Sequence, residues 1–182
     1  MTLNSGLGDV ISSSTTALDD SLGEKMIAIP GNDCNIWVVV HKLSSNRFRA
    51  FNVTAAGVDP VAVESASGSF TGPGAYAYGV IKCSHDRHKI VDVITENLAG
   101  VGGVEMHDFN PATGVVSDCQ VISGTGSFYG AEFSPNDSVL YVNCAGSGLP
   151  GGIFQYDISL PSTAAIIASR TILVSGPGWG NY

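Results

Sequence analysis

Basic residues are scarce in this sequence. Lysine and arginine number 8 in 182 residues, against 16 aspartates and glutamates, and the formal net charge is -8. Proteins hold nucleic acids and anionic membranes through clustered Lys and Arg side chains that neutralise phosphate groups. The few basic residues here form no stripe along the chain. We therefore expect neither nucleic acid nor an anionic membrane surface among the partners.

Long apolar runs are missing as well. A membrane-spanning helix needs roughly 18 or more consecutive apolar residues, and the longest compact run here is IWVVV at residues 36–40. Residues 1–20 lack the basic start and the apolar core of a signal peptide. We expect no membrane insertion, and we expect that a secreted form of the protein carries its signal upstream of this sequence.

Several motifs that carry chemistry are also absent. The four cysteines contain no CxxC pair, which disfavours a zinc knuckle or a redox dithiol. Their spacing leaves the disulfide state open for Cys34, Cys83, Cys119 and Cys144. The sequence has no GxSxG nucleophile elbow, no Walker A loop and no DxDxDG calcium loop. We expect a non-enzymatic protein without a cofactor, with calcium at clustered carboxylates as the remaining alternative.

Glycine and short β-type segments dominate what is present. The chain has 23 glycines. Its apolar runs are short, rich in β-branched or aromatic residues, and separated by turn signals such as PGND, LSSN, NPATG and SPND. AAIIASRTIL, at residues 164–173, is one of these strand-like runs, and only LGEKMIA, at residues 22–28, weakly indicates a helix. The pattern predicts an all-β chain.

A repeat runs through this pattern. YGVIKCSHDRHKIVDV, from Tyr78, matches YGAEFSPNDSVLYVNC, from Tyr129, without a gap and 51 residues apart. A Gly-Gly pair and a short strand follow each copy, in GGVEMHDFN and GGIFQYDIS, and a divergent third copy lies upstream in GNDCNIWVVVHKLSSNRFRAFNV. The repeat aligns Tyr78 with Tyr129, Gly79 with Gly130, Asp86 with Asp137, and Asp108 with Asp157.

Repeats of about 40 to 50 residues with four short strands are typical of β-propeller blades. One four-stranded sheet cannot bury both of its faces, so blades stack on one another. The sequence thus predicts four-stranded antiparallel blades, about three to four of them, over residues 23–182, after a lead-in strand or loop at residues 1–22. Closed propellers usually have more blades. We therefore expect either part of a longer chain or a propeller completed by further copies.

The repeat also guides the interpretation of candidate site residues. Aspartate at recurring turn positions is typical of turn chemistry, because its side chain bonds the backbone of its own turn, whereas catalysis uses unique residues with separated pKa values. His85 and His88, with Asp86 between them, are weak metal-site candidates by their HxxH spacing, but the matching turn lacks such ligands. We interpret them as a solvated turn. His107 takes the place of Tyr156 and is interpreted as a packing residue.

Some of these segments resemble known families. YGAEFSPNDSVLYVN followed by IFQYDIS is similar to the Ser-Pro-Asp-Gly strand pairs of lactonase-like and WD40-like propellers. GEKMIAIPGNDCNIWVVVHKLSSNRFRAFNVTAAGVDP, together with IIASRTIL, resembles the propeller region of large Bacteroidetes surface proteins that carry PKD-like modules and a type IX secretion sorting domain. The resemblance covers residues 23–173, with SHDR departing from the SPDG pattern. It implies an extracellular or cell-surface location.

Three functions stay open at this point. The first, favoured by the repeats and the missing catalytic motifs, is a non-catalytic extracellular module that scaffolds or binds a protein or glycan partner. The second is a self-assembling surface or filament subunit, in which unpaired blade edges join copies of the chain. The third is a lactonase-like propeller hydrolase, for which Glu24, Glu132 and Asn143 are the loose candidates.

Overall fold

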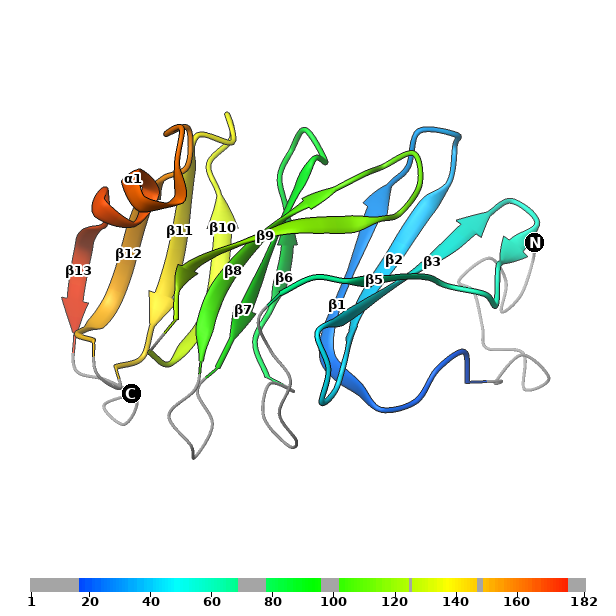
Figure 1. Ribbon diagram of the computed structural model, residues 1–182, viewed down its shortest axis with the longest axis horizontal. Helices are drawn as coiled ribbons and strands as arrows, with labels where there is room; N and C mark the ends of the chain where they lie inside the picture. Colours follow the sequence, from blue (N-terminus) through cyan, green and yellow to red (C-terminus); the bar gives the residue numbers. More distant parts are fainter. Residues whose placement is uncertain (1–16, 69–77, 96–101, 125, 147–148, 177–182) are drawn as a thin grey trace, which may run out of the picture.

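Three antiparallel sheets stand side by side in the computed structural model, in the manner of propeller blades (Figure 1). The structure describes residues 17–68, 78–95, 102–124, 126–146 and 149–176. We call the sheets blade A, blade B and blade C in chain order. They confirm the all-β class and the propeller-type blades, with three blades in the part of the chain that the structure describes.

Strands that follow one another in the chain pair as neighbours in blades B and C, and through the first four strands of blade A, whose fifth strand pairs with the third. Blade A consists of β1 (Leu22–Pro30), β2 (Ile36–Lys42), β3 (Arg47–Thr54), β4 (Gly57–Val58) and β5 (Val63–Ala66). Blade B consists of β6 (Ile81–Cys83), β7 (Lys89–Ile94), β8 (Gly103–Phe109) and β9 (Val116–Ser123). Blade C consists of β10 (Phe128–Phe133), β11 (Val139–Cys144), β12 (Gly151–Asp157) and β13 (Thr171–Gly176). In blade A, β4 only extends the end of β3, and β5 is the fourth full strand.

The segment that weakly indicated a helix forms β1 instead. Its side chains alternate with a period of two: Lys25 and Ile29 are buried and Ile27 packs on the same core, while Met26 between them is exposed. This alternation is that of a strand with one buried face. Tertiary pairing with β2 overrides the helix propensity of the segment. The lead-in at residues 1–22 stays a prediction, because residues 1–16 lie outside the described part.

A short helix, α1 (Thr163–Ala168), replaces the first half of the strand expected at residues 164–173. Ser162 caps it, since its Oγ accepts a hydrogen bond from Ala165 N at 3.2 Å, and alanine-rich turns favour helix. Ile166 is the residue that α1 buries. In that run only the residues from Thr171 onward are a strand, β13.

Two apolar layers hold the blades together. The layer between blades A and B is built from Ile29, Trp37, Val39, Phe48, Ala50, Ile81, Ile90, Phe109 and Val116. The layer between blades B and C, which α1 also joins, contains Val91, Val93, Val104, Met106, Phe128, Leu140, Val142, Phe154, Tyr156 and Ile166. All four cysteines are free thiols. No helix among the described residues is long and apolar enough to cross a membrane.

Candidate functional site

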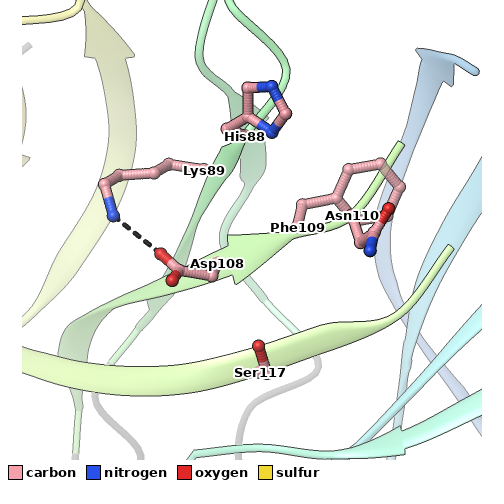
Figure 2. Close-up of a pocket in the computed structure, with 6 residues that line it drawn as sticks. All are labelled: His88, Lys89, Asp108, Phe109, Asn110 and Ser117. Atoms are coloured by element: carbon pink, nitrogen blue, oxygen red, sulfur yellow. Dashed lines mark hydrogen bonds and ion pairs between the residues drawn. The ribbon is translucent and has the colours of Figure 1, made fainter. Parts of the chain in front are cut away.

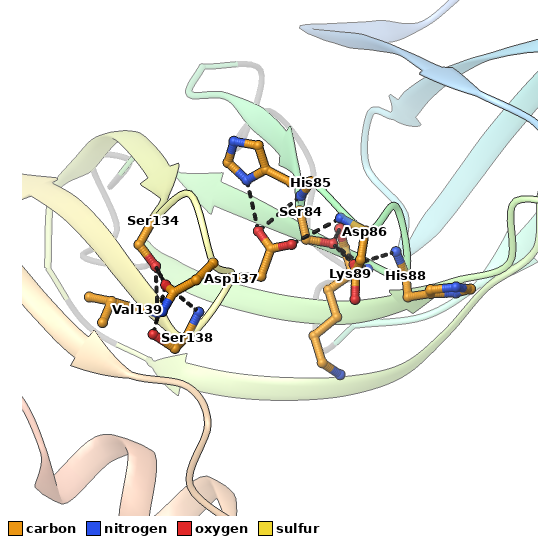
Figure 3. A network of polar contacts seen from close by, with 10 residues as sticks. Ser84, His85, Asp86, His88, Lys89, Ser134, Asp137, Ser138 and Val139 are labelled. Carbon is orange, nitrogen blue, oxygen red and sulfur yellow. Dashed lines mark hydrogen bonds and ion pairs between the residues drawn. The ribbon is translucent and has the colours of Figure 1, made fainter.

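The two matched turns join the first and second strands of blades B and C, as the repeat predicted, and they lie next to each other (Figure 3). In the first turn, Asp86 Oδ1 accepts a hydrogen bond from Ser84 Oγ at 2.6 Å. In the second, Asn136 Oδ1 accepts one from Ser134 Oγ at 2.8 Å. The structural counterpart of Asp86 is therefore Asn136, 50 residues later, and the ungapped alignment with Asp137 is out by one residue.

The two Tyr-Gly pairs occupy different places as well. Tyr78 and Gly79 precede β6, whereas Tyr129 and Gly130 lie inside β10, where the register shifts between Phe128 and Ala131. This bulge puts one extra residue on β10. The two identical dipeptides therefore do not occupy equivalent positions. A sequence alignment anchored on them is out of register with the structure at the turn.

Asp108 and Asp157 do lie at equivalent strand positions, but their bonds differ. Asp108 Oδ1 accepts from Lys89 Nζ at 2.7 Å, whereas Asp157 Oδ1 accepts from Ser159 N at 3.0 Å and Ser159 Oγ at 2.6 Å. The first bond pairs two strands and the second closes a turn. The aspartate recurs at the same strand position in both blades, but it makes a different interaction in each.

Each turn is tied to the preceding blade by the residue at its left-handed position. Arg87 (φ 67°) and Asp137 (φ 54°) are structural counterparts. Arg87 Nη1 donates to the carbonyl oxygens of Pro30 and Gly31 in blade A, at 3.1 and 3.2 Å. Asp137 Oδ1 accepts from the backbone N–H and from Nδ1 of His85 in blade B, both at 2.9 Å. Two opposite charges thus perform the same structural task, which sequence similarity could not indicate.

The weak metal candidates are used in these turn bonds. The ring of His85 bonds Asp137, and Asp86 Oδ1 also accepts from the backbone N–H of His88 at 2.9 Å. In the described part of the chain, these residues do not gather three ligand atoms in one place. Their geometry is that of a hydrogen-bonded turn.

Replacing Asp137 with asparagine should lower the free energy of unfolding by about 2 kcal/mol at pH 7, because three hydrogen bonds lose a charged acceptor. Burial raises the pKa of Asp137, but bonds from the backbone and ring of His85 and from the backbone of Asp86 outweigh burial and hold the pKa below its usual value. The stabilisation is therefore full above the unfolded pKa, about 4, and disappears as the pH falls through the lower folded pKa. Urea unfolding between pH 7 and pH 2 measures the difference.

Asp86→Asn is the matched control for this variant. Asparagine already makes the corresponding bond in the other turn, through Asn136, so this replacement should cost about 0.5 kcal/mol or less on an exposed turn. An equal loss in both variants, or a loss in Asp137→Asn that does not shrink in acid, would show that Asp137 does not connect the blades through its charge.

The candidates for a hydrolase have separate roles. Glu24 Oε1 accepts from Gly79 N and from the hydroxyl of Tyr129, both at 3.4 Å. Glu132 pairs with Lys82 Nζ at 2.9 Å, across blades B and C. Asn143 is exposed on β11. Glu132 serves an inter-blade ion pair and Glu24 bridges first strands, so neither has an arrangement typical of an acid–base pair.

A hollow of about 420 Å³ opens beside the end of β8 (Figure 2). It is lined by His88, Lys89, Asp108, Phe109, Asn110 and Ser117. Figure 2 shows the Lys89 ammonium and the Asp108 carboxylate directed at each other in this hollow. The two charges neutralise one another, so the hollow offers neither a free base nor an ion-binding charge from this pair.

The interface between blades A and B contains a buried group of ionisable side chains that the sequence analysis missed. Lys25 on β1 donates to Asp92 Oδ1 on β7 at 2.6 Å, and the two side chains are 0% and 1% exposed. Lys25 Nζ also lies 3.3 Å from Val93 O. Among the described residues, Asp92 Oδ2 is buried without a hydrogen-bond partner. A buried ion pair with an unsatisfied oxygen is costly to maintain, and such groups cluster at functional sites.

Further polar residues continue this group along blade B. Glu105 pairs with Asp92 across β7 and β8, so the two side chains share a face, and His107 follows two residues later on that face. Ligand atoms of Glu105, His107 and Cys119 lie within 4.8 Å of one another. Burial lowers the pKa of His107, which leaves the ring neutral at pH 7. Burial also raises the pKa of the Cys119 thiol to about 12.

The interface between blades B and C has no such group at the matching positions. Val142, Phe154 and Tyr156 stand where blade B has Asp92, Glu105 and His107, and they belong to the apolar layer. The buried charges are therefore not a requirement of the blade repeat. Their signal in the sequence is a charge inside an apolar strand, as in KIVDVIT, and two polar residues at spacing two, as in VEMHDF.

Comparisons with known proteins add little to this picture. No protein-family model matches the chain, and no curated protein matches it significantly. Hydrazine synthase from Kuenenia stuttgartiensis is a similar solved structure, with a TM-score of 0.47 and 12% sequence identity over 71% of this chain. This chain spans 38% of the length of that one. The blade architecture rests on the three described sheets themselves.

Proposed function

We propose that this chain is a non-catalytic propeller module that binds a protein partner through the outward face of blade C. The observation that carries the proposal is a change of side-chain type at matching positions. The outward face of blade B presents Val91, Val93, Val104 and Met106, and blade C covers all four to 0–1% exposure. At the matching positions, blade C presents Tyr141, Asn143, Ile153 and Gln155.

This face combines apolar and polar groups in the way that protein interfaces do. Ile153 is 40% exposed and its cross-strand neighbour Val174 is 56% exposed. Tyr141 and Gln155 face each other on the adjoining strands. A face made to be covered by another blade would be as apolar as that of blade B, whereas non-obligate interfaces are about as polar as ordinary protein surface and are enriched in tyrosine. The composition therefore favours a separate, folded partner.

A protein is favoured over a glycan as the partner. The hollow beside β8 holds the self-paired ions Lys89 and Asp108, while the blade C face offers exposed aliphatic side chains, which contribute to protein binding by apolar burial. We also propose a cell-surface location of the type IX secreted kind. That part rests only on the likeness of residues 23–173 to Bacteroidetes surface propellers.

Site-specific photo-crosslinking tests the proposal. A photoreactive phenylalanine analogue is placed at Ile153, and in a control chain at Ala164, an exposed residue of α1, in cells of the organism that encodes the protein. We expect an adduct with one other protein at position 153 and none at position 164. An adduct between two copies of this chain would support the self-assembling alternative and overturn the proposal. Equal labelling at the two positions, or none, would also contradict it.

A further inference from the structure

The side chains of Glu105, His107 and Cys119 form a compact set of oxygen, nitrogen and sulfur donors. One ligand atom from each lies within 4.8 Å of the other two. Glu105 and His107 are buried in β8, at 5% and 1% exposure, and Cys119 is half-buried in β9. Ligand atoms around a tetrahedral zinc ion lie about 3.5 Å apart. His107 Nε2 and Glu105 Oε2, at 3.7 Å, are already close to that spacing.

The pairing of β8 with β9 brings the third donor into the set. Glu105 and His107 share a face because they are two residues apart on one strand. The register between β8 and β9 shifts between Met106 and Asp108, and Asp118 has a positive φ of 50°. Because Gln120 pairs with Met106, the adjacent residue, Cys119, lies opposite His107 and on the same face. The bulge follows directly and sets Cys119 and Asp118 together against His107.

The histidine has the bonding pattern of a metal ligand. Its Nδ1 is 2.9 Å from Ser67 Oγ, which follows β5 in blade A. Its Nε2 is buried without a hydrogen-bond partner among the described residues, and lies 3.7 Å from Glu105 Oε2. Metal-bound histidines typically donate their other N–H to an oxygen that fixes the tautomer and the ring orientation. Ser67 fits that role, because a proton on Nδ1 donated to Ser67 Oγ puts the lone pair on Nε2, which faces Glu105.

We propose that Glu105, His107 and Cys119 bind a zinc ion at the interface between blades A and B. A thiol and an imidazole favour zinc over calcium or magnesium, which prefer oxygen ligands alone. The site is closed on one side by Gly68, since a Cβ there would lie 2.5 Å from Glu105 Oε2. Ser67 and Gly68 belong to blade A and the three ligands to blade B, so the ion stabilises the contact between the two blades.

Cobalt substitution tests the site. The purified chain is stripped with a chelator and titrated with Co²⁺, which reports tetrahedral thiolate coordination through its visible and near-ultraviolet absorption. We expect one Co²⁺ per chain with a thiolate-to-cobalt charge-transfer band, and displacement of Co²⁺ by one Zn²⁺. Cys119→Ser should abolish that band, and His107→Gln should weaken binding at least about tenfold. Cys83→Ser is the matched control, because Cys83 is another half-buried thiol whose pKa burial raises to about 12.

The outcomes separate clearly. A missing band in the parent chain, or a band that survives in Cys119→Ser, would overturn the proposal, and so would a band lost in Cys83→Ser. If Cys119→Ser does not fold, alkylation of the parent chain decides the question. Zinc should protect Cys119 from iodoacetamide and leave Cys34, the exposed thiol, fully reactive, whereas equal labelling of Cys119 with and without zinc would refute the site.

Discussion

Replacing Asp92 with asparagine should lower the free energy of unfolding by about 3 to 5 kcal/mol. The replacement keeps the shape of the side chain and removes its charge, so the buried Lys25 ammonium loses the carboxylate that it pairs with and keeps its hydrogen bond to the neutral Val93 O. An uncompensated charge inside a protein is far more costly than a missing neutral bond. Urea unfolding of the chelator-treated chain measures the loss without a contribution from bound metal.

Asp108→Asn is the matched control for this prediction. It also breaks a lysine–aspartate pair, at 2.7 Å, but the side chains of Lys89 and Asp108 are 36% and 48% exposed. Water compensates both groups when such a pair is broken, so the expected loss is about 1 kcal/mol or less. If the two variants lose equal stability, the pair between Lys25 and Asp92 is not buried in solution.

A double variant separates the cost of an orphaned charge from the value of the pair. Lys25→Met with Asp92→Val puts apolar groups at both positions, and Val142 already fills the matching position in blade C. Buried ion pairs are often replaced by apolar residues at little cost. We expect the double variant to recover most of the stability that Asp92→Asn loses. A double variant as unstable as the single one would mean that the pair itself stabilises the interface.

The blade pattern was readable from the sequence because its determinants are local. Ser84 and Asp86 in one turn, and Ser134 and Asn136 in the other, bond within six residues of chain, and apolar strands flank both turns. Local hydrogen bonds of this kind recur wherever the same residue types recur. That is why the hairpins and the all-β class could be predicted without knowledge of the tertiary contacts.

The interface residues could not be predicted, because their positions depend on strand register and on bulges. Cys119 joins Glu105 and His107 through the pairing of Gln120 with Met106, which places Cys119 opposite His107. Asp137 and Arg87 occupy equivalent turn positions and both bond to the preceding blade, although their side chains carry opposite charges. Hydrogen bonds between blades join residues far apart in the chain, 40 residues for Ser67 and His107 and 52 for His85 and Asp137. A one-residue slip in strand register turns a side chain to the opposite face. A single sequence carries little information on strand register or on which distant residues meet.

Two glycines that the repeat aligns, Gly79 and Gly130, lie at different positions in their blades, before β6 and inside β10. Gly79→Ala should lower the free energy of unfolding by about 3 kcal/mol, from backbone strain at positive φ and from overpacking. Gly79 has a φ of 123°, and a Cβ at this residue would lie 2.0 Å from Val93 O. That carbonyl oxygen is part of the backbone and also faces Lys25 Nζ, so it cannot move away without disturbing the buried ion pair.

Gly130→Ala is the control that tests whether position or residue type decides the effect. A Cβ at Gly130 would have Asn143 Cβ as its nearest neighbour, at 3.8 Å, which is ordinary van der Waals contact. We expect the change to stay within about 0.5 kcal/mol, or to stabilise slightly because alanine restricts the unfolded chain. Chemical denaturation of both variants decides the matter. Equal losses would contradict the difference in free space around the two glycines.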